Sequence, residues 1–131
     1  MNEERIAVER HGQAINDRDG VAYRQTMNFP FTYQNYNGVA LTIDQAEDCG
    51  VAAPLPWDII LKTHPDWDRT EFDQIEEVAS SVSSAVYKIS FRRIDTSGRF
   101  DGVFQAIWIV TRQSDHWGVQ FRHNLGGQSI D

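Results

Sequence analysis

Four polar side chains in the C-terminal third could form a site for proton transfer: Arg93, Asp101, Gln105 and His123. When the segments that carry them are aligned as antiparallel hairpins, all four fall on one face of a sheet. The imidazole of His123 can accept a proton near neutral pH, as a general base does. Arg93 and Asp101 would face each other and could orient a water or a substrate oxyanion. We therefore take His123, Asp101 and Arg93 as the catalytic candidates.

Each candidate also has a purely structural interpretation. His123 could be a hydrogen-bonded histidine at the rim, and Arg93 with Asp101 could form a cross-strand ion pair, which contributes little when exposed. Aromatic side chains on the same face could wall an apolar ligand cavity or fill an ordinary core. The predicted ligand-binding residues are Tyr33, Trp57, Tyr87, Phe91, Gln105 and Phe121.

Three strand-like runs must position these residues: 84–95, 99–113 and 116–125. The first alternates apolar and polar residues, which is typical of a half-buried strand. Gly98 suits the left-handed position of a three-residue hairpin loop, so that Asp95 pairs with Arg99. A similar turn pairs Arg112 with His116. The predicted partners are then Arg93 with Asp101, Phe91 with Val103, Ile89 with Gln105, Tyr87 with Ile107, Val119 with Ile109, Phe121 with Ile107, and His123 with Gln105.

This register gives the sheet two different faces. Besides the candidate site, the first face carries a predicted core. The second mixes aromatic and polar residues: Lys88, Ser90, Arg92, Phe104, Ala106, Trp108, Gln120 and Arg122. An aromatic patch of this kind suits a subunit interface better than open water, so we expect a homodimer through the convex face. A slip of one residue would exchange the faces of a strand.

The N-terminal half supplies elements that could cover the first face. Residues 3–16 fit an amphipathic helix with His11 on its buried side, and Asp19 can cap a second helix. Residues 29–36 resemble a strand that turns back at Asn37-Gly38, with residues 39–41 as its short return. Short helices are predicted at 42–49 and 54–63. Residues 67–80 favour a strand over a helix because they lead directly into the next strand.

The global numbers predict one compact domain, residues 1–131. With 131 residues, 40% of them hydrophobic, the chain can build one substantial core. The N-terminus is charged and lacks an apolar run, so we expect neither a signal peptide nor a membrane span. The single cysteine, Cys49, is compatible with the cytoplasm. A net charge of −7 argues against nonspecific nucleic-acid binding, which depends on neutralising phosphates.

The sequence offers little sign of metal or cofactor chemistry. No pair of histidines has the spacing of metal ligands, so we infer no metal. There is no nucleotide-binding glycine loop, and we expect no cofactor. Cys49 lies between Asp48 and Gly50, an acidic setting that disfavours a reactive thiolate. His64 and His116 fall in predicted turns and are expected to be solvated.

Several stretches carry a resemblance to a known family: Asp19-Gly20-Val21 through Asn28-Phe29-Pro30-Phe31, residues 93–99 (RIDTSGR) and residues 115–120 (DHWGVQ). With the order of elements, they resemble the nuclear transport factor 2-like superfamily over essentially the whole chain. The resemblance implies an α+β, cystatin-like fold, in which a cone-shaped, curved antiparallel sheet wraps around N-terminal helices.

The same resemblance implies three possible functions, because fold does not fix reaction. The first is a small-molecule-binding domain, homodimeric, with a pocket inside the cone for a small apolar ligand. The second is an isomerase, cyclase or hydrolase of the ketosteroid-isomerase or SnoaL type, acting on an apolar ring compound with His123 as base. The third is a noncatalytic dimerisation or partner-binding module. The acidic base of such enzymes has no unambiguous counterpart in this sequence.

Overall fold

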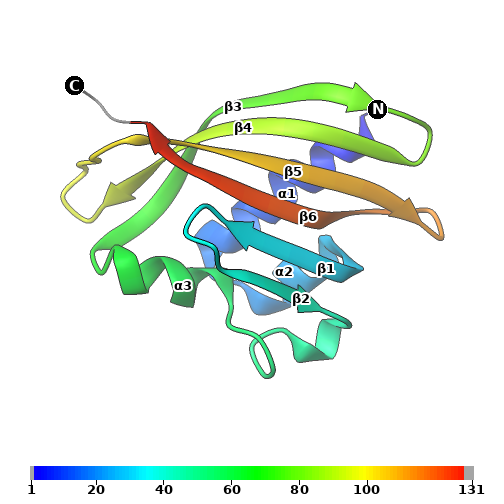
Figure 1. Cartoon of the computed structure of the whole chain (residues 1–131), viewed down its shortest axis with the longest axis horizontal. Helices are drawn as coiled ribbons and strands as arrows, with labels where there is room; N and C mark the ends of the chain where they lie inside the picture. The colour runs from blue at the N-terminus through cyan, green and yellow to red at the C-terminus, as the bar shows by residue number, and fades with distance from the viewer. Residues whose placement is uncertain (1, 129–131) are drawn as a thin grey trace.

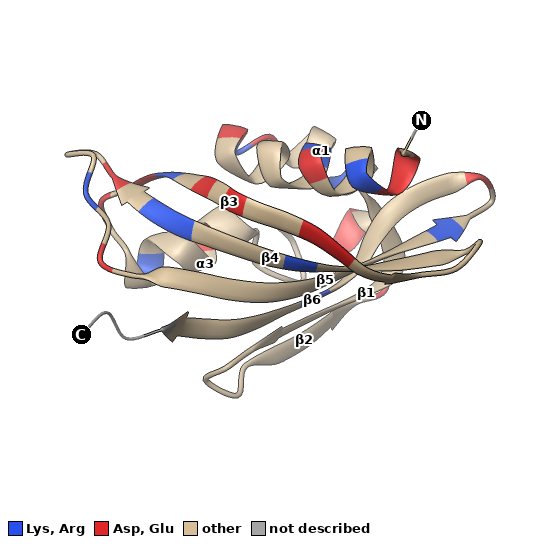
Figure 2. Cartoon of the chain, turned by 90° about the horizontal axis from the view of Figure 1, so that it is seen from above, with Lys and Arg blue, Asp and Glu red and all other residues tan. Residues whose placement is uncertain are grey.

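The computed structural model describes residues 2–128 as a curved six-stranded sheet with helices on one face (Figures 1 and 2). Two helices come first, and a third lies between the second and third strands. In chain order the elements are α1 (Glu3–Asp17), α2 (Gly20–Gln25), β1 (Met27–Asn35), β2 (Ala40–Ile43), a short 3₁₀ helix (Ala46–Asp48), α3 (Pro56–Thr63), β3 (Trp67–Ser80), β4 (Ser84–Asp95), β5 (Val103–Gln113) and β6 (His116–Gln128).

The strands are ordered β2-β1-β6-β5-β4-β3 across the sheet. All neighbouring pairs are antiparallel except β1 and β6, which run parallel. The sheet is therefore mixed rather than wholly antiparallel as predicted, because the chain passes through the helical segment and four strands before β6 returns beside β1. The predicted α+β architecture, a curved sheet with N-terminal helices against it, is confirmed.

Local signals explain where the helices begin. The side chain of Asn2 accepts a hydrogen bond from the backbone N–H of Arg5 and caps α1, and Asp19 caps α2 in the same way through Ala22. Pro56 occupies the first turn of α3, where its missing N–H costs nothing. The predicted helix at 42–49 is reduced to the 3₁₀ turn, because β2 extends to Ile43.

The first C-terminal hairpin turns as predicted but pairs differently beyond the turn. Gly98 has φ +80°, and the N–H of Asp95 donates to the carbonyl of Arg99 at 2.8 Å. Residues 100–102 then lie outside the strand ladder, and Phe91 pairs with Phe104 instead of Val103. The predicted register is thus wrong by one residue along β4 and β5, which places Tyr87 opposite Trp108 and Ile89 opposite Ala106.

The second hairpin also departs from the prediction. Ser114 and Asp115 both have positive φ, so the turn has two residues and pairs Gln113 with His116 rather than Arg112 with His116. Two register shifts follow in β6, where Gln120 and Leu125 are left without an opposite partner. Val119 consequently pairs with Val110, Phe121 with Ile109, and His123 with Ile107.

The slip in β5 decides which side chains face the helices. Ala106, Trp108 and Val110 lie on the concave face, where they are buried against α1 and its neighbours. Trp108 is only 4% exposed within a single chain. The predicted interface patch of Phe104, Ala106 and Trp108 is therefore wrong, because these residues are covered by their own chain. Ile107, Ile109 and Phe121 occupy the convex face instead, each half-buried.

Gly118 marks the closest approach of β6 to the start of β1. A Cβ at this position would lie 2.7 Å from the carbonyl carbon of Met27 and 2.9 Å from the amide nitrogen of Asn28. These are backbone atoms of the neighbouring strand and cannot move aside without disturbing the sheet. The absence of a side chain at Gly118 thus permits the parallel contact that joins the two halves of the chain.

We expect Gly118→Ala to lower the free energy of unfolding by about 3 kcal/mol, at the upper end of the usual cost of overpacking. Urea unfolding followed by tryptophan fluorescence measures this change. Gly20→Ala is the matched control, because its new Cβ meets only the flexible end of Arg24, at 3.1 Å. An equal loss of stability in both variants would contradict this account of Gly118.

Candidate functional site

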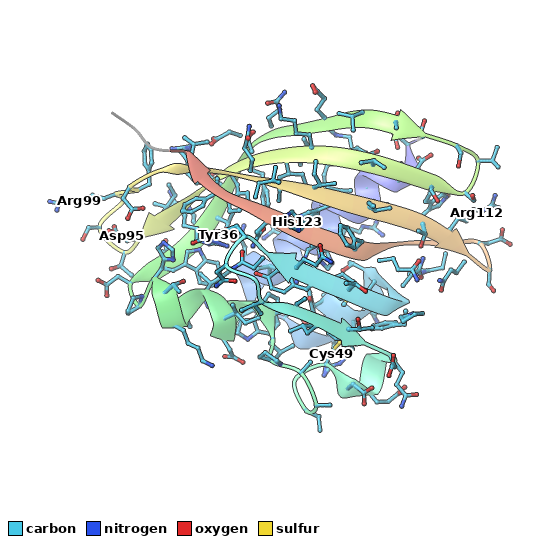
Figure 3. The ribbon with its side chains drawn as sticks, viewed as in Figure 1. Tyr36, Cys49, Asp95, Arg99, Arg112 and His123 are labelled. Carbon is cyan, nitrogen blue, oxygen red and sulfur yellow. The ribbon has the colours of Figure 1, made fainter. Side chains whose placement is uncertain are left out.

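A cavity of about 160 Å³ lies between α3, the end of β1 and the concave face of the sheet. The exposed residues Tyr36, Asn37 and Thr63 stand at its mouth, and Figure 3 shows Tyr36 above α3. The wall is made of Ile15, Tyr33, Asn35, Tyr36, Asn37, Pro56, Ile59, Ile60, Thr63, His64, Thr70, Phe72, Phe91, Arg93, Phe104, Gln105, Trp108, Arg122, Asn124 and Gly126.

Aromatic rings form the sheet side of this cavity. Phe91 and Phe104, which are partners across β4 and β5, stack with ring centroids 5.6 Å apart. Phe72 meets Trp108 edge to face at 5.8 Å. Both arrangements are among those that aromatic pairs prefer. The wall is therefore rigid and apolar, as is typical of a site for a small organic molecule.

Arg122 is a buried cation beside this aromatic wall. It comes from β6, is 6% exposed, and lines the cavity. Its guanidinium carbon lies 5.0 to 5.5 Å from the ring centroids of Tyr23, Phe31 and Tyr33. These cation–π contacts stabilise the charge partially. Among residues 2–128, no carboxylate forms an ion pair with it.

A chain of buried hydrogen bonds fixes the position of Arg122. Its Nη1 donates to Nε2 of His11 at 2.7 Å, and Nδ1 of His11 lies 2.8 Å from the Thr26 hydroxyl. Thr26 in turn donates to the carbonyl of Tyr23. This direction of donation requires a neutral imidazole with its proton on Nδ1. Burial lowers the pKa of His11 well below its usual value, and the charge of Arg122 lowers it further.

Arg93 is a second arginine in the cavity wall, contributed by β4. Its guanidinium lies over Phe91 and Phe104, 5.1 and 5.2 Å from the ring centroids. The Nε atom is buried and has no hydrogen-bond partner within the described chain. Burial lowers the pKa of Arg93, and the nearby Arg122 acts in the same direction. Both arginines are thus held by rings rather than by acids.

The charge of the cavity wall is opposite to that of the whole protein. Among residues 2–128, no aspartate or glutamate lines the cavity, although the chain has a net charge of −7. The acids gather instead on β3 and α1 (Figure 2). The neighbouring Arg92 faces away from the cavity and pairs with Asp73 through two 2.8 Å contacts. Arg92 therefore has an acidic partner, whereas no ion pair joins either cavity arginine to an acid among residues 2–128.

His64 is the histidine that the structure brings to the cavity wall. It follows α3, meets the ring of Phe104 edge to face at 6.0 Å, and is half-buried. Burial lowers its pKa, with a smaller contribution from the charge of Arg93. The imidazole is therefore neutral at pH 7. The expectation that His64 is solvated is wrong, because α3 places it over the aromatic wall.

Four of the predicted site residues line the cavity: Tyr33, Phe91, Arg93 and Gln105. His123 does not, because it pairs with Ile107 on the convex face and hydrogen-bonds to Gln34 at 3.1 Å; Figure 3 shows it along the middle of the sheet. The expectation that it faces the cavity is wrong, because β5 is slipped by one residue.

The other predicted site residues also lie outside this cavity. Asp101 is exposed and lines a neighbouring hollow that Arg93 also borders, but no ion pair joins the two in the described chain. Trp57 packs on Tyr23 in the core. The hydroxyl of Tyr87 donates to Glu77, and Phe121 pairs with Ile109 on the convex face. The predicted convergence of these groups with His123 is therefore wrong.

Sequence reasoning missed Arg122, His64, Tyr36 and Asn124, all of which line the cavity. Arg122 was assigned to the outer face, and only the correct register of β6 turns it inward. The amide of Asn124 donates to the Tyr33 hydroxyl at 3.1 Å. Arg122 directly precedes His123, so the sequence places the two on opposite faces of the strand but does not say which of them faces the helices.

Two further searches cover the described residues only. Within residues 2–128, no three His, Cys, Asp or Glu side chains are grouped so as to hold a metal ion. Over the same range, no helix is both long and apolar enough to cross a membrane.

Comparison with solved structures reveals the same fold in many proteins. An uncharacterised protein with a cystatin-like fold from Caulobacter vibrioides has a TM-score of 0.72 and 15% identity, over 99% of this chain and 90% of that chain. An NTF2-like protein of unknown function from Pseudomonas putida has a TM-score of 0.66 and 18% identity, over 92% and 81%. A ketosteroid isomerase-like protein from Erwinia carotovora atroseptica has a TM-score of 0.64 and 12% identity, over 98% and 95%.

These similarities establish the fold, which is cystatin-like and NTF2-like. No family model matches the chain, and no curated protein matches it in sequence. At identities this low a shared fold does not carry an activity with it.

The hydrogen-bond chain through His11 generates a prediction about pH. The unfolded chain binds a proton on this histidine near pH 6.5, whereas the folded chain resists protonation until a lower pH. Acid therefore favours the unfolded state, and His64, whose pKa is also lowered, acts in the same direction. The free energy of unfolding should fall below pH 6.5, by at most about 1.4 kcal/mol per pH unit for each histidine.

Urea unfolding at pH 7.5, 6.5 and 5.5 measures this slope, and His11→Gln should reduce it. Nitrogen-15 NMR of labelled histidine supplies the direct readout, with the proton of His11 on Nδ1 throughout the range. A pKa of His11 at or above 6.5 in the folded protein would contradict the assignment.

Proposed function

We propose that this domain binds a small organic molecule in the cavity between α3 and the concave face of the sheet. The observation that carries the proposal is a hollow with rigid aromatic walls on which several polar groups converge. Sites of this composition are the usual places for small ligands. A purely structural module would gain stability by filling such a hollow, since each empty space forfeits packing.

The size of the hollow limits what it would hold. An engineered cavity of about 150 Å³ accommodates one benzene molecule, and this one measures about 160 Å³. Its mouth at Tyr36 and Thr63 leaves room for a substituent to reach outward. The proposed ligand is therefore a compound of one or two rings.

An enzyme acting on such a compound is the second candidate, favoured by the position of His64. Its imidazole lines the cavity, is neutral at pH 7, and lies near Arg93. A neutral histidine can accept a proton from the substrate as a general base, and the guanidinium of Arg93 can stabilise the negative charge left on the substrate. An isomerase, cyclase or hydrolase would use these groups. Analysis of bound compounds for conversion to products, by mass spectrometry, separates this candidate from simple binding.

We also propose a homodimer through the convex face of the sheet. No helix of the described part of the chain covers that face (Figures 1 and 2). Its central strands present the half-buried apolar residues Val86, Ile107, Ile109 and Phe121. A second copy of the chain would cover these side chains symmetrically, as most homodimers do. The residues that support the dimer are thus different from those expected from the sequence.

We also propose that the protein is cytoplasmic. Its one cysteine, Cys49, is a free and buried thiol, and burial raises its pKa. A chain with this cysteine usage suits a compartment in which thiols stay reduced.

Narrowing the cavity should abolish ligand binding without unfolding the protein. Ile59→Trp places a large ring in the wall, whereas Lys62→Trp adds the same ring to an exposed position of the same helix. A thermal-shift screen of neutral and charged one- and two-ring compounds should find ligands that raise Tm by about 10 °C at a hundredfold excess over Kd. The shift should disappear in Ile59→Trp and persist in Lys62→Trp. Equal shifts in the two variants would place binding elsewhere.

Sedimentation at micromolar concentration should give a species of twice the 15.0 kDa chain mass. Ile107→Asp puts a charge in the middle of the convex face and should yield the single chain, because a desolvated carboxylate there has no partner. Val82→Asp, in an exposed turn, is the control and should leave the dimer intact. A wild-type protein of 15.0 kDa would rule the dimer out.

A further inference from the structure

We infer that the ligand of this cavity carries an anionic head group, a carboxylate or a phosphate, attached to its ring. The inference rests on the proposed function, since it concerns the chemistry of the same cavity. It follows from the two arginines in the wall, Arg93 and Arg122, and from what surrounds them.

The first step concerns the cost of burying these cations. Taking a guanidinium out of water costs several kcal/mol unless an anion or a full set of acceptors compensates it. Arg122 is 6% exposed, and its contacts are with neutral groups: His11, the hydroxyl of Tyr23 and three aromatic rings. Arg93 has two aromatic rings and a buried Nε without a partner. The described chain thus leaves both charges incompletely compensated.

The second step concerns carboxylates of the protein itself as partners for these arginines. Acids are abundant, yet none of the described residues that line the cavity is an acid, and Arg92, one residue from Arg93, has its own carboxylate partner in Asp73. Arg92 therefore has the carboxylate partner that Arg93 lacks within residues 2–128, although the two are adjacent in β4. An arginine fork presents several N–H donors in a geometry that fits carboxylate and phosphate oxygens. The cavity arginines retain that capacity, whereas Arg92 does not.

The third step concerns the body of the ligand. The guanidinium of Arg93 lies over Phe91 and Phe104, whose stacked rings form the apolar wall. A ring lying on this wall would bring a short acidic substituent toward Arg93. The neutral imidazole of His64, beside the same wall, adds a polar group without repelling an anion. The chemical class that fits is an aromatic or cyclic acid rather than a neutral ring compound.

A set of matched probes tests the charge directly. Phenylacetate and phenyl phosphate carry the anion, and phenylacetamide and benzyl alcohol are their neutral counterparts. Titration calorimetry on the whole chain should show one of the anions binding about tenfold to a hundredfold more tightly than its neutral counterpart, as expected for charge-assisted hydrogen bonds. Which anion binds more tightly distinguishes the carboxylate from the phosphate as the head group.

Substitution of Arg93 is the second part of the experiment. In Arg93→Met the preference for the anion should fall below about threefold, while the neutral probe binds as before. Arg92→Met is the matched control on the opposite face and should keep the preference. Without ligand, Arg93→Met should unfold at the same or a higher temperature, because it removes a half-buried cation whose buried Nε has no partner in the described chain. Arg93→Lys should keep part of the preference, since it retains the charge without the fork.

The outcomes separate this inference from the proposed function. Neutral probes that bind as tightly as the anions would overturn the anionic head group and leave a binding cavity in place. A preference for the anion that is equal in wild type and Arg93→Met would also overturn the role of Arg93. If no probe binds, charged or neutral, and Ile59→Trp changes nothing in the wider screen, the proposed function fails as well.

Discussion

The buried guanidinium of Arg122 is the interaction on which the arrangement of this protein depends. It draws together His11 from α1, Tyr23 from α2, and Phe31 and Tyr33 from β1 around one charge on β6. An uncompensated cation in a low-dielectric interior is costly, so each contact that spreads or accepts the charge matters. The helices are therefore positioned on the sheet by polar requirements as well as by apolar packing. A neutral His11 is part of this arrangement, because a second cation beside Arg122 would repel it.

Strand register is the second constraint, since it determines the side of the sheet to which each residue belongs. Residues 100–102 shift the pairing of β5 with β4 by one residue after the Gly98 turn. In β6, the unpaired residues Gln120 and Leu125 each shift its pairing with β5 by one residue. These shifts turn Trp108 and Arg122 inward and His123 outward. Bulges are common near functional sites because they redirect side chains without breaking the sheet. In this protein they bring an arginine into the cavity wall and remove a histidine from it.

The net charge of the protein and the charge of the cavity wall have opposite signs. The chain carries −7, and nine of its 19 acids lie on β3 and α1, whereas the described residues of the cavity wall include two arginines and no acid. The net charge of a protein affects its solubility and its nonspecific binding of large polyanions. It says little about one small anion that enters a hollow, where the field is set by the nearest groups. The two observations are consistent because they concern different length scales.

The sequence by itself determined the elements of this protein, because their signals are local. The caps at Asn2 and Asp19, the alternation along β4 and the left-handed Gly98 all act within a few residues. The resemblance that predicted the curved α+β fold also rests on element order. Tyr33, Phe91, Arg93 and Gln105, which the sequence assigns to a ligand site, line the cavity, although the register that grouped the last three was wrong. Which face each strand turns to the helices was decided only by the tertiary structure. A shift of one residue leaves local propensities unchanged but exchanges the faces, and the packing of α1 and α3 against the sheet selects between the two.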